Sequence, residues 1–358
     1  MFEPVDIIKP KARTLRAYTL SGHRAAVKIN QNENPWDAPA RIKAETERRL
    51  ATRPWSRYPD FGRAALHEQL AKFAGWTAAG VLAGNGSNEL IQAILMVTVG
   101  VGRRVLICEP TFALYRQIVT LLDGEVLSVP LTETLSYDIG LLERTLAERK
   151  PHVTIICSPN NPTGCAIDDD DLRRLLKEST GLVIVDEAYH EFSGHSVVPL
   201  LKDFANLVVL RTFSKAMAMA GLRIGYMLAS PELAREVSKA LLPYNLNVIS
   251  QTAAEVAIQF YEEELRPRVA SIVAERNRLF TELENIWGLA PVPSRANFMV
   301  VRSRIEPQKL FTELLRRDIL VRDVSAYPML SDYFRVSVGT PEENDKLMSA
   351  LREILEQE

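Results

Sequence analysis

The sequence predicts an α/β protein in which a domain with a mostly parallel sheet is followed by a smaller α+β domain. Between residues 80 and 230, short apolar runs rich in branched side chains alternate with helix-length segments. This alternation is typical of parallel strands that helices cover on both faces. After Pro243 the chain changes to long, charged helical patterns with only a few strand-like runs. A length of 358 residues also exceeds what one ordinary core accommodates.

Two groups of strands follow from these patterns. The first domain should take its strands from residues 105–108, 125–129, 153–157, 182–186, 207–211 and 224–229. Helices are expected at 250–265 and 267–286, interrupted by Pro267, and the second domain should take its strands from 297–301, 319–323 and 333–338. We therefore expect an amino-terminal arm at 1–28 that packs on the small domain or a partner subunit, a large domain at 29–245 and a small domain at 246–358.

Composition narrows the class of protein. Apolar residues make up 47% of the chain and charged residues 25%, and the net charge of −2 gives no electrostatic basis for binding nucleic acid. The longest apolar patch, thirteen residues from Leu90, is too short to span a bilayer. The opening MFEPVDIIKP lacks the pattern of a signal peptide. We expect a cytoplasmic protein without membrane or nucleic-acid partners.

The cysteines and histidines do not predict a metal site. Cys108, Cys157 and Cys165 contain no CxxC pair, which favours reduced thiols. The stretch HEFSGH, from His190 to His195, misses the HExxH zinc spacing by one residue. No metal is therefore expected.

Polar side chains follow three of the predicted strands where each strand ends. Asn161 lies just after 153–157, Asp186 ends 182–186 with Tyr189 three residues on, and Ser214 and Lys215 follow 207–211. Ligands of parallel α/β sheets bind beyond the carboxyl ends of the strands, so these groups should converge. Lys215 stands among small apolar residues, where an ammonium ion must be exposed, paired, deprotonated or covalently used.

A glycine-containing turn precedes a predicted helix that starts at Ser87. Gly84 and Gly86 in AGNGSNE leave backbone N–H groups at the helix start, which is a ready anion site. The turn has no Walker lysine, and Glu89 occupies the third glycine position of the dinucleotide fingerprint, which disfavours a nicotinamide dehydrogenase. An ordinary helix cap remains the alternative.

Pyridoxal 5′-phosphate is one cofactor that needs all of these parts. Its aldehyde forms a Schiff base with a lysine, and its pyridine nitrogen needs an acidic partner. Its phenolic oxygen takes hydrogen-bond donors, and its phosphate takes N–H groups and an arginine. Lys215 is then the Schiff-base lysine.

Four stretches carry a resemblance to a known family: CSPNNPTG (157–164), VDEAY (185–189), TFSKAMAMAGLRIGY (212–226) and YFRVSVGT (333–340). They resemble the fold type I aminotransferases, and most closely the histidinol-phosphate aminotransferase group. The resemblance runs from about residue 28 to the carboxyl terminus. It implies a seven-stranded sheet in the large domain and a homodimer with shared active sites.

The resemblance also implies roles for individual residues. Lys215 forms the Schiff base and moves the substrate proton, Asp186 pairs with the pyridine nitrogen, and Tyr189 donates to the phenolic oxygen. The remaining cofactor-binding residues are Asn161 at the phenolic oxygen, Phe112 on the ring, Ser87, Asn88, Ser214 and Arg223 at the phosphate, and Tyr58 reaching the phosphate from a partner subunit.

On the substrate side, Arg335 matches the arginine that takes a carboxylate. The residues assigned around the distal end of the substrate are Arg322, Tyr18 and Asn34. Phe112 could instead belong to the core, in which case Tyr115 lines the substrate pocket. Each motif has a structural alternative: Asp186 as a helix cap, Asn161 as a turn residue, and both arginines as solvated surface groups. All of these alternatives would have to hold together, in the family's order, which favours the site.

The resemblance therefore implies an aminotransferase that works by a ping-pong cycle on small-molecule substrates. Glutamate is the expected amino donor, and imidazole-acetol phosphate is converted to histidinol phosphate, a step of histidine biosynthesis. The main alternative is an aromatic amino-acid aminotransferase, followed by a phosphothreonine decarboxylase of the same fold. A non-catalytic, cofactor-binding regulator is disfavoured because the chain is not basic.

Overall fold

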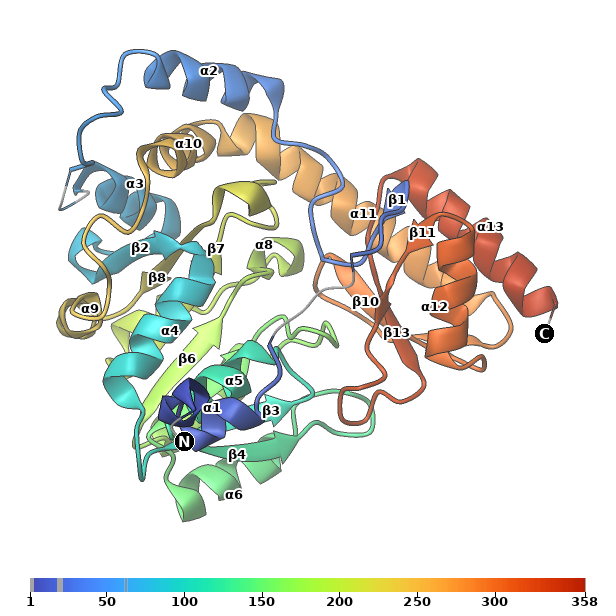
Figure 1. The fold of residues 1–358 in the computed structure, drawn as a ribbon, viewed down its shortest axis with the longest axis horizontal. Coiled ribbons are helices and arrows are strands. Elements are labelled where there is room, and N and C mark those ends of the chain that lie inside the picture. Colours follow the sequence, from blue (N-terminus) through green and yellow to red (C-terminus); the bar gives the residue numbers. More distant parts are fainter. Residues whose placement is uncertain (1–2, 18–21, 61, 63, 358) are drawn as a thin grey trace.

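The computed structural model describes all residues except 1–2, 18–21, 61, 63 and 358. Its centre is a seven-stranded sheet of order β2-β8-β7-β6-β5-β3-β4 (Figure 1). All pairs among β7, β6, β5, β3 and β4 are parallel, whereas β8 is antiparallel to both of its neighbours. This confirms the predicted α/β class with a mostly parallel sheet. The strand bounds are β2 (Val81–Asn85), β3 (Arg104–Glu109), β4 (Glu125–Pro130), β5 (Val153–Cys157), β6 (Leu182–Asp186), β7 (Leu207–Thr212) and β8 (Ile224–Leu228).

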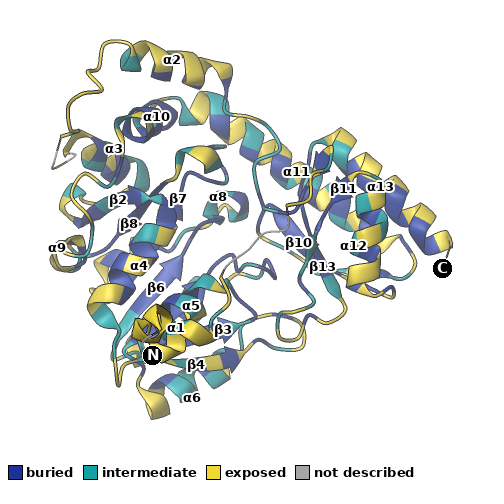
Figure 2. Ribbon diagram, viewed as in Figure 1, coloured by how far each residue is buried: buried dark blue, intermediate teal, exposed yellow. Residues whose placement is uncertain are grey.

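Successive residues of the central strands enter two different cores. Ile155 and Ile184 belong to one buried cluster, and their chain neighbours Ile156 and Val185 belong to another. A strand alternates its side chains between the two faces of a sheet, so both faces are buried. The helices around this sheet are α2 (Ala40–Leu50), α3 (Ala64–Ala74), α4 (Gly86–Thr98), α5 (Leu114–Leu121), α6 (Ile139–Arg149), α7 (Asp169–Glu178), α9 (Pro231–Ser238) and α10 (Val248–Gln259). Most of them expose their outer faces, whereas α10 is largely buried and packs against α2 (Figure 2).

The smaller domain is built on an antiparallel sheet of order β12-β13-β10-β9. The predicted strand at 319–323 is divided, because its first half pairs in parallel with β1 and its second half pairs with β13. The elements are β1 (Val27–Lys28), β9 (Leu289–Pro291), β10 (Phe298–Ser303), β11 (Ile319–Leu320), β12 (Arg322–Asp323), β13 (Tyr333–Ser337), α11 (Arg266–Glu284), α12 (Pro307–Arg316) and α13 (Pro341–Glu356).

The predicted domain boundary between 245 and 246 does not follow the packing. Ala254 and Val256 of α10 are fully buried in the same core as the large sheet, and that core extends to Leu265. Within α11, the residues that enter the small-domain core begin only at Leu279. Pro267 does separate the two helical segments, and it sits in the first turn of α11, where a missing N–H costs nothing.

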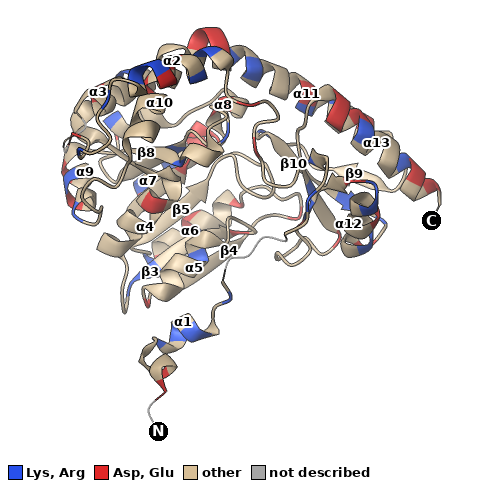
Figure 3. Cartoon of the chain, turned by 45° about the horizontal axis from the view of Figure 1, so that its top comes forward, with Lys and Arg blue, Asp and Glu red and all other residues tan. Residues whose placement is uncertain are grey.

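The amino-terminal arm contacts both domains. Its first part, η1 (Pro4–Ile7) and α1 (Pro10–Thr14), lies near α5, with Lys9 Nζ 2.9 Å from Asp123 Oδ2. It projects from the body of the molecule (Figure 3). Among the described residues, the later part of the arm joins the small domain. The ring of His23 lies 5.9 Å from that of Phe311, the N–H of Ala26 donates to Asp318, and β1 pairs with β11. The remaining short helical segments are η2 (Ala78–Gly80), α8 (His190–Ser193), η3 (Val198–Lys202), η4 (Ala220–Leu222) and η5 (Tyr261–Leu265).

In the part of the chain that the structure describes, no helix is both long enough and apolar enough to cross a bilayer.

Candidate active site

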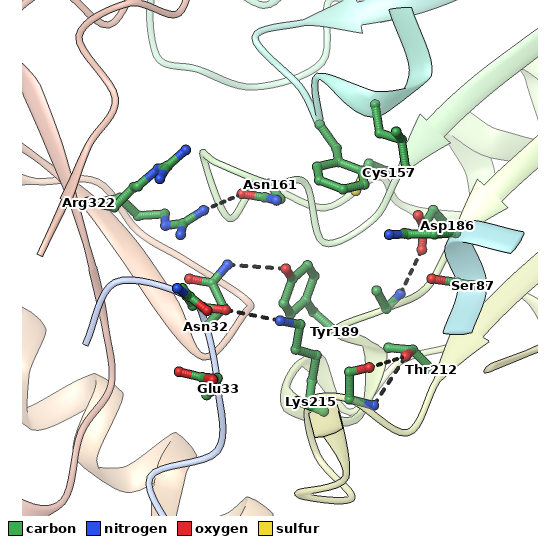
Figure 4. Close-up of a pocket in the computed structure, with 18 of the residues that line it drawn as sticks. Asn32, Glu33, Ser87, Cys157, Asn161, Asp186, Tyr189, Thr212, Lys215 and Arg322 are labelled. Carbon is green, nitrogen blue, oxygen red and sulfur yellow. Dashed lines mark hydrogen bonds between the residues drawn. The ribbon is translucent and has the colours of Figure 1, made fainter. Parts of the chain in front are cut away.

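A pocket of about 530 Å³ opens at the carboxyl ends of β5, β6 and β7, between the large sheet and the small domain (Figure 4). The side chains predicted to converge there do converge. The predicted residues that line the pocket are Ser87, Asn88, Phe112, Tyr115, Asn161, Asp186, Tyr189, Ser214, Lys215, Arg223, Arg322 and Arg335.

Lys215 follows β7, and its amine points into the pocket (Figure 4). Its Nζ donates to the carbonyl oxygen of Gln31 at 3.1 Å and lies 5.8 Å from the centre of the Tyr189 ring. Burial lowers the pKa of Lys215 to about 7, and the positive charge of Arg335 adds to this effect. A large fraction of Lys215 is therefore a neutral amine near pH 7, which is the nucleophilic form.

Asp186 ends β6 and is 3% exposed. Its Oδ2 accepts from the Tyr115 hydroxyl at 2.7 Å, and its Oδ1 accepts from the backbone N–H of Ala188 at 3.1 Å. Burial raises the pKa of Asp186 to about 6, against the lowering effect of these two donors. A buried carboxylate of this kind is stabilised by a cation, and a protonated pyridine nitrogen would supply one. Helix capping, the alternative for Asp186, accounts for only the Ala188 contact.

Tyr115 lines the pocket with a side chain that is fully buried, and its hydroxyl donates to Asp186. Phe112 lies edge-on against Tyr115, with ring centroids 5.6 Å apart, and also borders the pocket, so it remains available to cover a ring. The burial of Tyr115 follows the helical periodicity of α5, because Tyr115, Ile118 and Val119 share its buried face.

Asn161 and Tyr189 border the pocket close to Lys215. Asn161 accepts from Arg335 Nη1 through its Oδ1 at 2.6 Å, which leaves its amide N–H groups for another acceptor. Tyr189 accepts from Asn32 Nδ2 at 3.1 Å, which leaves its own proton for another acceptor. Asn32 belongs to the stretch NENPW (32–36), and no sequence pattern singled it out.

Four residues form an anion cup around the start of α4. Asn85, the residue before α4, makes no side-chain capping bond, so the first-turn N–H groups of Ser87 and Asn88 are not capped from there. Arg223 Nη1 donates to Ser214 Oγ at 3.2 Å. A Cβ at Gly86 would lie 2.8 Å from the Arg223 guanidinium, so glycine keeps the cup open. Backbone N–H groups, a hydroxyl and a guanidinium are what a phosphate needs.

Arg335 and Arg322 form a second cationic region. They lie opposite each other on β13 and β12, so their side chains leave the same face of the small sheet. Arg335 is only 7% exposed, and it donates to Asn161 Oδ1 and to the Asn30 carbonyl at 2.8 Å. The alternative interpretation of Arg335 as a solvated surface arginine is therefore wrong.

Two predicted residues, Asn34 and Tyr58, do not line this pocket. Asn34 donates to the backbone carbonyls of Lys215 and Ala216, at 3.3 and 3.2 Å, so it supports the lysine segment instead of meeting the substrate. Tyr58 is 80% exposed and stacks on Tyr244, with ring centroids 4.4 Å apart. Tyr18 lies outside the described residues.

The site also differs from a metal centre. Among the residues the structure describes, no group of three or more His, Cys, Asp or Glu side chains could hold a metal ion. Cys108 and Cys157 are buried thiols, and Cys165 is partly buried and also free.

Each chemical group of pyridoxal phosphate has matching residues in this pocket. The amine of Lys215 faces Tyr189, and the buried Asp186 lies deeper at the sheet end. The third part is the anion cup at the start of α4, which a Cβ at Gly86 would obstruct. These contacts match the four chemical needs of the cofactor.

Known proteins resemble this chain over nearly its whole length. Residues 24–351 match the family model for class I and II aminotransferases. The histidinol-phosphate aminotransferase of Chlorobium luteolum is 40% identical over 351 residues, covering 97% of this chain and 98% of the relative. The histidinol-phosphate aminotransferase of Clostridium acetobutylicum superposes with a TM-score of 0.87 at 25% identity, covering 93% of this chain and 100% of that one.

The Sinorhizobium meliloti histidinol-phosphate aminotransferase, solved in complex with pyridoxal-5′-phosphate, has a TM-score of 0.88 at 24% identity. That match covers 98% of both chains and shows a shared fold. Family model, sequence relatives and fold agree with the motifs. The chain therefore belongs to the class I and II aminotransferase family.

Proposed function

We propose that this protein is a pyridoxal-phosphate-dependent histidinol-phosphate aminotransferase, with glutamate and 2-oxoglutarate as the second substrate pair. The observation that carries the proposal is a pocket with two separate anion sites. One is the cup at the start of α4, and the other is the pair Arg335 and Arg322 on the small domain. The first suits the cofactor phosphate, and the second suits a phosphate or carboxylate of the substrate.

Pyridoxal phosphate, when bound, links covalently to amino groups and withdraws electrons from the bond being broken. The protein's own residues supply the rest. Lys215 acts as the neutral amine and as the base that takes and returns the proton at the substrate's Cα. Asp186 stays ionised opposite the pyridine nitrogen and so holds the proton there. Tyr189 and Asn161 donate to the phenolic oxygen.

Two partner reactions can share the second anion site. A guanidinium binds carboxylate or phosphate through the same forked geometry, so Arg335 can take glutamate in one half-reaction and a phosphate ester in the other. Arg322 adds a second positive charge beside it, which favours a phosphate over a carboxylate. The relatives at about 40% identity carry the histidinol-phosphate name, which supports this choice over an aromatic substrate.

A homodimer with a shared active site belongs to the proposal. Tyr58 lies outside its own pocket, is 80% exposed and stacks on Tyr244, and Trp55 and Leu242, which are close to these two tyrosines in the sequence, are also exposed. Exposed aromatic side chains that stack in this way are typical of a protein interface. We propose that Tyr58 reaches the cofactor phosphate of the partner subunit from there. A cytoplasmic location remains a prediction.

A half-reaction panel tests the function. Glutamate, histidinol phosphate, phenylalanine and phosphothreonine are added separately to the protein with bound cofactor, and the cofactor's absorption is followed. We expect rapid conversion of the band by glutamate and histidinol phosphate. Preferential conversion by phenylalanine would move the assignment to an aromatic aminotransferase. Release of CO₂ from phosphothreonine would move it to a decarboxylase.

A further inference from the structure

We propose that Asn32 is a positioning residue that directs the hydroxyl proton of Tyr189 toward the phenolic oxygen of the cofactor. The inference rests on the proposed function insofar as it needs pyridoxal phosphate in the pocket. It does not depend on which amino compound is the substrate. It concerns the bond between Asn32 Nδ2 and the Tyr189 hydroxyl, 3.1 Å long and buried (Figure 4).

The direction of this bond follows from the contacts of Ser337. The backbone N–H of Asn32 donates to Ser337 Oγ at 2.8 Å, so the serine hydroxyl is an acceptor there. The same hydroxyl donates its proton to Asn32 Oδ1 at 3.0 Å. The amide oxygen of Asn32 therefore faces Ser337, and its NH₂ group faces Tyr189.

The Tyr189 hydroxyl accordingly acts as an acceptor toward Asn32. A phenol has a single proton, and Asn32 Nδ2 cannot receive it. The proton must point elsewhere, and the hydroxyl borders the pocket beside Lys215. A hydroxyl that accepts one hydrogen bond is also a stronger donor in the next. Asn32 thus sets both the direction and the strength of the bond that Tyr189 donates.

Asn32 is held firmly enough for this role. It is 1% exposed, and its φ of 54° lies in the left-handed region that asparagine tolerates better than most residues. Asn297 Nδ2 donates to its carbonyl oxygen at 3.2 Å. Ser337 and Asn297 both belong to the small domain, whereas Tyr189 belongs to the large domain. The small domain therefore holds in place the Asn32 amide that donates to the Tyr189 hydroxyl.

Asn32 is also anchored to β13, the strand that carries Arg335. Ser337 lies two residues after Arg335 on β13, and in a strand such residues share a face. The strand that carries the substrate-binding arginine therefore also carries the anchor of Asn32.

A pH titration of the lysine-bound cofactor's absorption tests the inference without any substrate. The band changes when the nitrogen that Lys215 contributes gains a proton. A donor on the phenolic oxygen stabilises the unprotonated form, so it lowers that pKa. Tyr189→Phe should raise the pKa by about one pH unit, the value of one hydrogen bond to a charged oxygen.

Asn32→Asp is the decisive variant. It keeps the shape and the left-handed backbone but presents a carboxylate, which would accept the Tyr189 proton and turn it away from the cofactor. Its added charge also raises the pKa, and the same substitution in the Tyr189→Phe background measures that effect alone. We expect the rise to be larger by about one pH unit when Tyr189 is present. Equal rises in the two backgrounds would overturn the inference.

Two further variants complete the design. Asn32→Gly removes the amide at a φ that glycine accepts; it should raise the pKa by less than Tyr189→Phe does, and not at all in the Tyr189→Phe background. Gln31→Glu adds the same charge next to Asn32 and should give equal rises in both backgrounds. The charged groups that line the pocket, namely Glu33, Asp186, Lys215, Arg223, Arg322 and Arg335, are the same in every protein compared.

The outcomes separate this inference from the proposed function. A wild-type protein without any lysine-bound cofactor band would overturn both. A normal band, normal transamination and equal rises for Asn32→Asp in the two backgrounds would overturn only the role of Asn32. If Asn32→Asp fails to bind the cofactor, the Asn32→Gly pair decides by the same comparison.

Discussion

Lys215 should bind pyridoxal phosphate as a neutral amine at neutral pH. Burial and the charge of Arg335 lower its pKa from 10.5 to about 7. Roughly half of the side chains are then neutral at pH 7, against about one in three thousand for an unperturbed lysine. The lowered pKa favours the neutral form above pH 7, so reactivity should rise with pH and level off early.

The assay mixes cofactor-free protein with pyridoxal phosphate and follows absorption by stopped flow. The neutral fraction grows from about one tenth at pH 6 to about nine tenths at pH 8, so the rate of uptake should rise about tenfold across this range. It should change little between pH 8 and 9.5. A rate that still climbs about tenfold per pH unit from 8 to 10 would show an unperturbed lysine and refute the reasoning.

Two variants should shift the midpoint of the rate profile in opposite directions. Arg335 lowers the pKa of Lys215 by repulsion, so Arg335→Gln should move the midpoint of the rate profile to higher pH. Glu33 raises the pKa by attraction, so Glu33→Gln should move the midpoint to lower pH. Shifts of the same sign in both variants would mean that structural disturbance, not charge, sets the midpoint.

Three other predictions concern the remaining parts of the site. Asp186→Asn keeps the shape but removes the buried charge, so steady-state turnover should fall by orders of magnitude while circular dichroism is unchanged; near wild-type turnover would leave Asp186 as a structural cap. Arg335→Lys loses the forked contact, about 2–4 kcal/mol, so kcat/KM for histidinol phosphate should fall roughly thirty- to several-hundred-fold; an unchanged value places phosphate recognition elsewhere. Mixing Tyr58→Ala and Lys215→Ala subunits at limiting cofactor should restore about a quarter of the sites if Tyr58 acts across a dimer. The reason is that about half of randomly paired dimers are mixed, and each mixed dimer has one intact site. No recovery despite subunit exchange would place Tyr58 in its own chain's site.

The sheet could be predicted where hydrophobicity alone decides the structure. Strands such as 153–157 and 182–186 are buried on both faces, and continuous apolar runs identify them. Strand β2, VLAGN, was missed because its glycine and asparagine are poor strand formers. It forms because it pairs with β8, where Gly225 allows the backbone of Gly86 and Ser87 to approach closely.

The candidate site could be predicted where a residue follows a strand directly. Asp186 and Lys215 occupy such positions, so topology alone brings them together. Tyr115 and Asn34 depend instead on side-chain direction, which sequence spacing does not determine. Their partners, Asp186 and the carbonyls of Lys215 and Ala216, lie at least 71 residues away in the chain. Asn32 was missed for the same reason, since Ser337 is 305 residues away.

The most direct test of the central claim compares histidinol phosphate with histidinol as amino donors, under identical conditions and with 2-oxoglutarate as acceptor. The two compounds differ only in the phosphate that Arg335 and Arg322 are proposed to bind. When the anion that pairs with a buried guanidinium is missing, the site loses about 2–4 kcal/mol of binding free energy. We predict a kcat/KM for histidinol phosphate that is roughly thirty- to several-hundred-fold higher. Equal values for the two compounds would contradict the account.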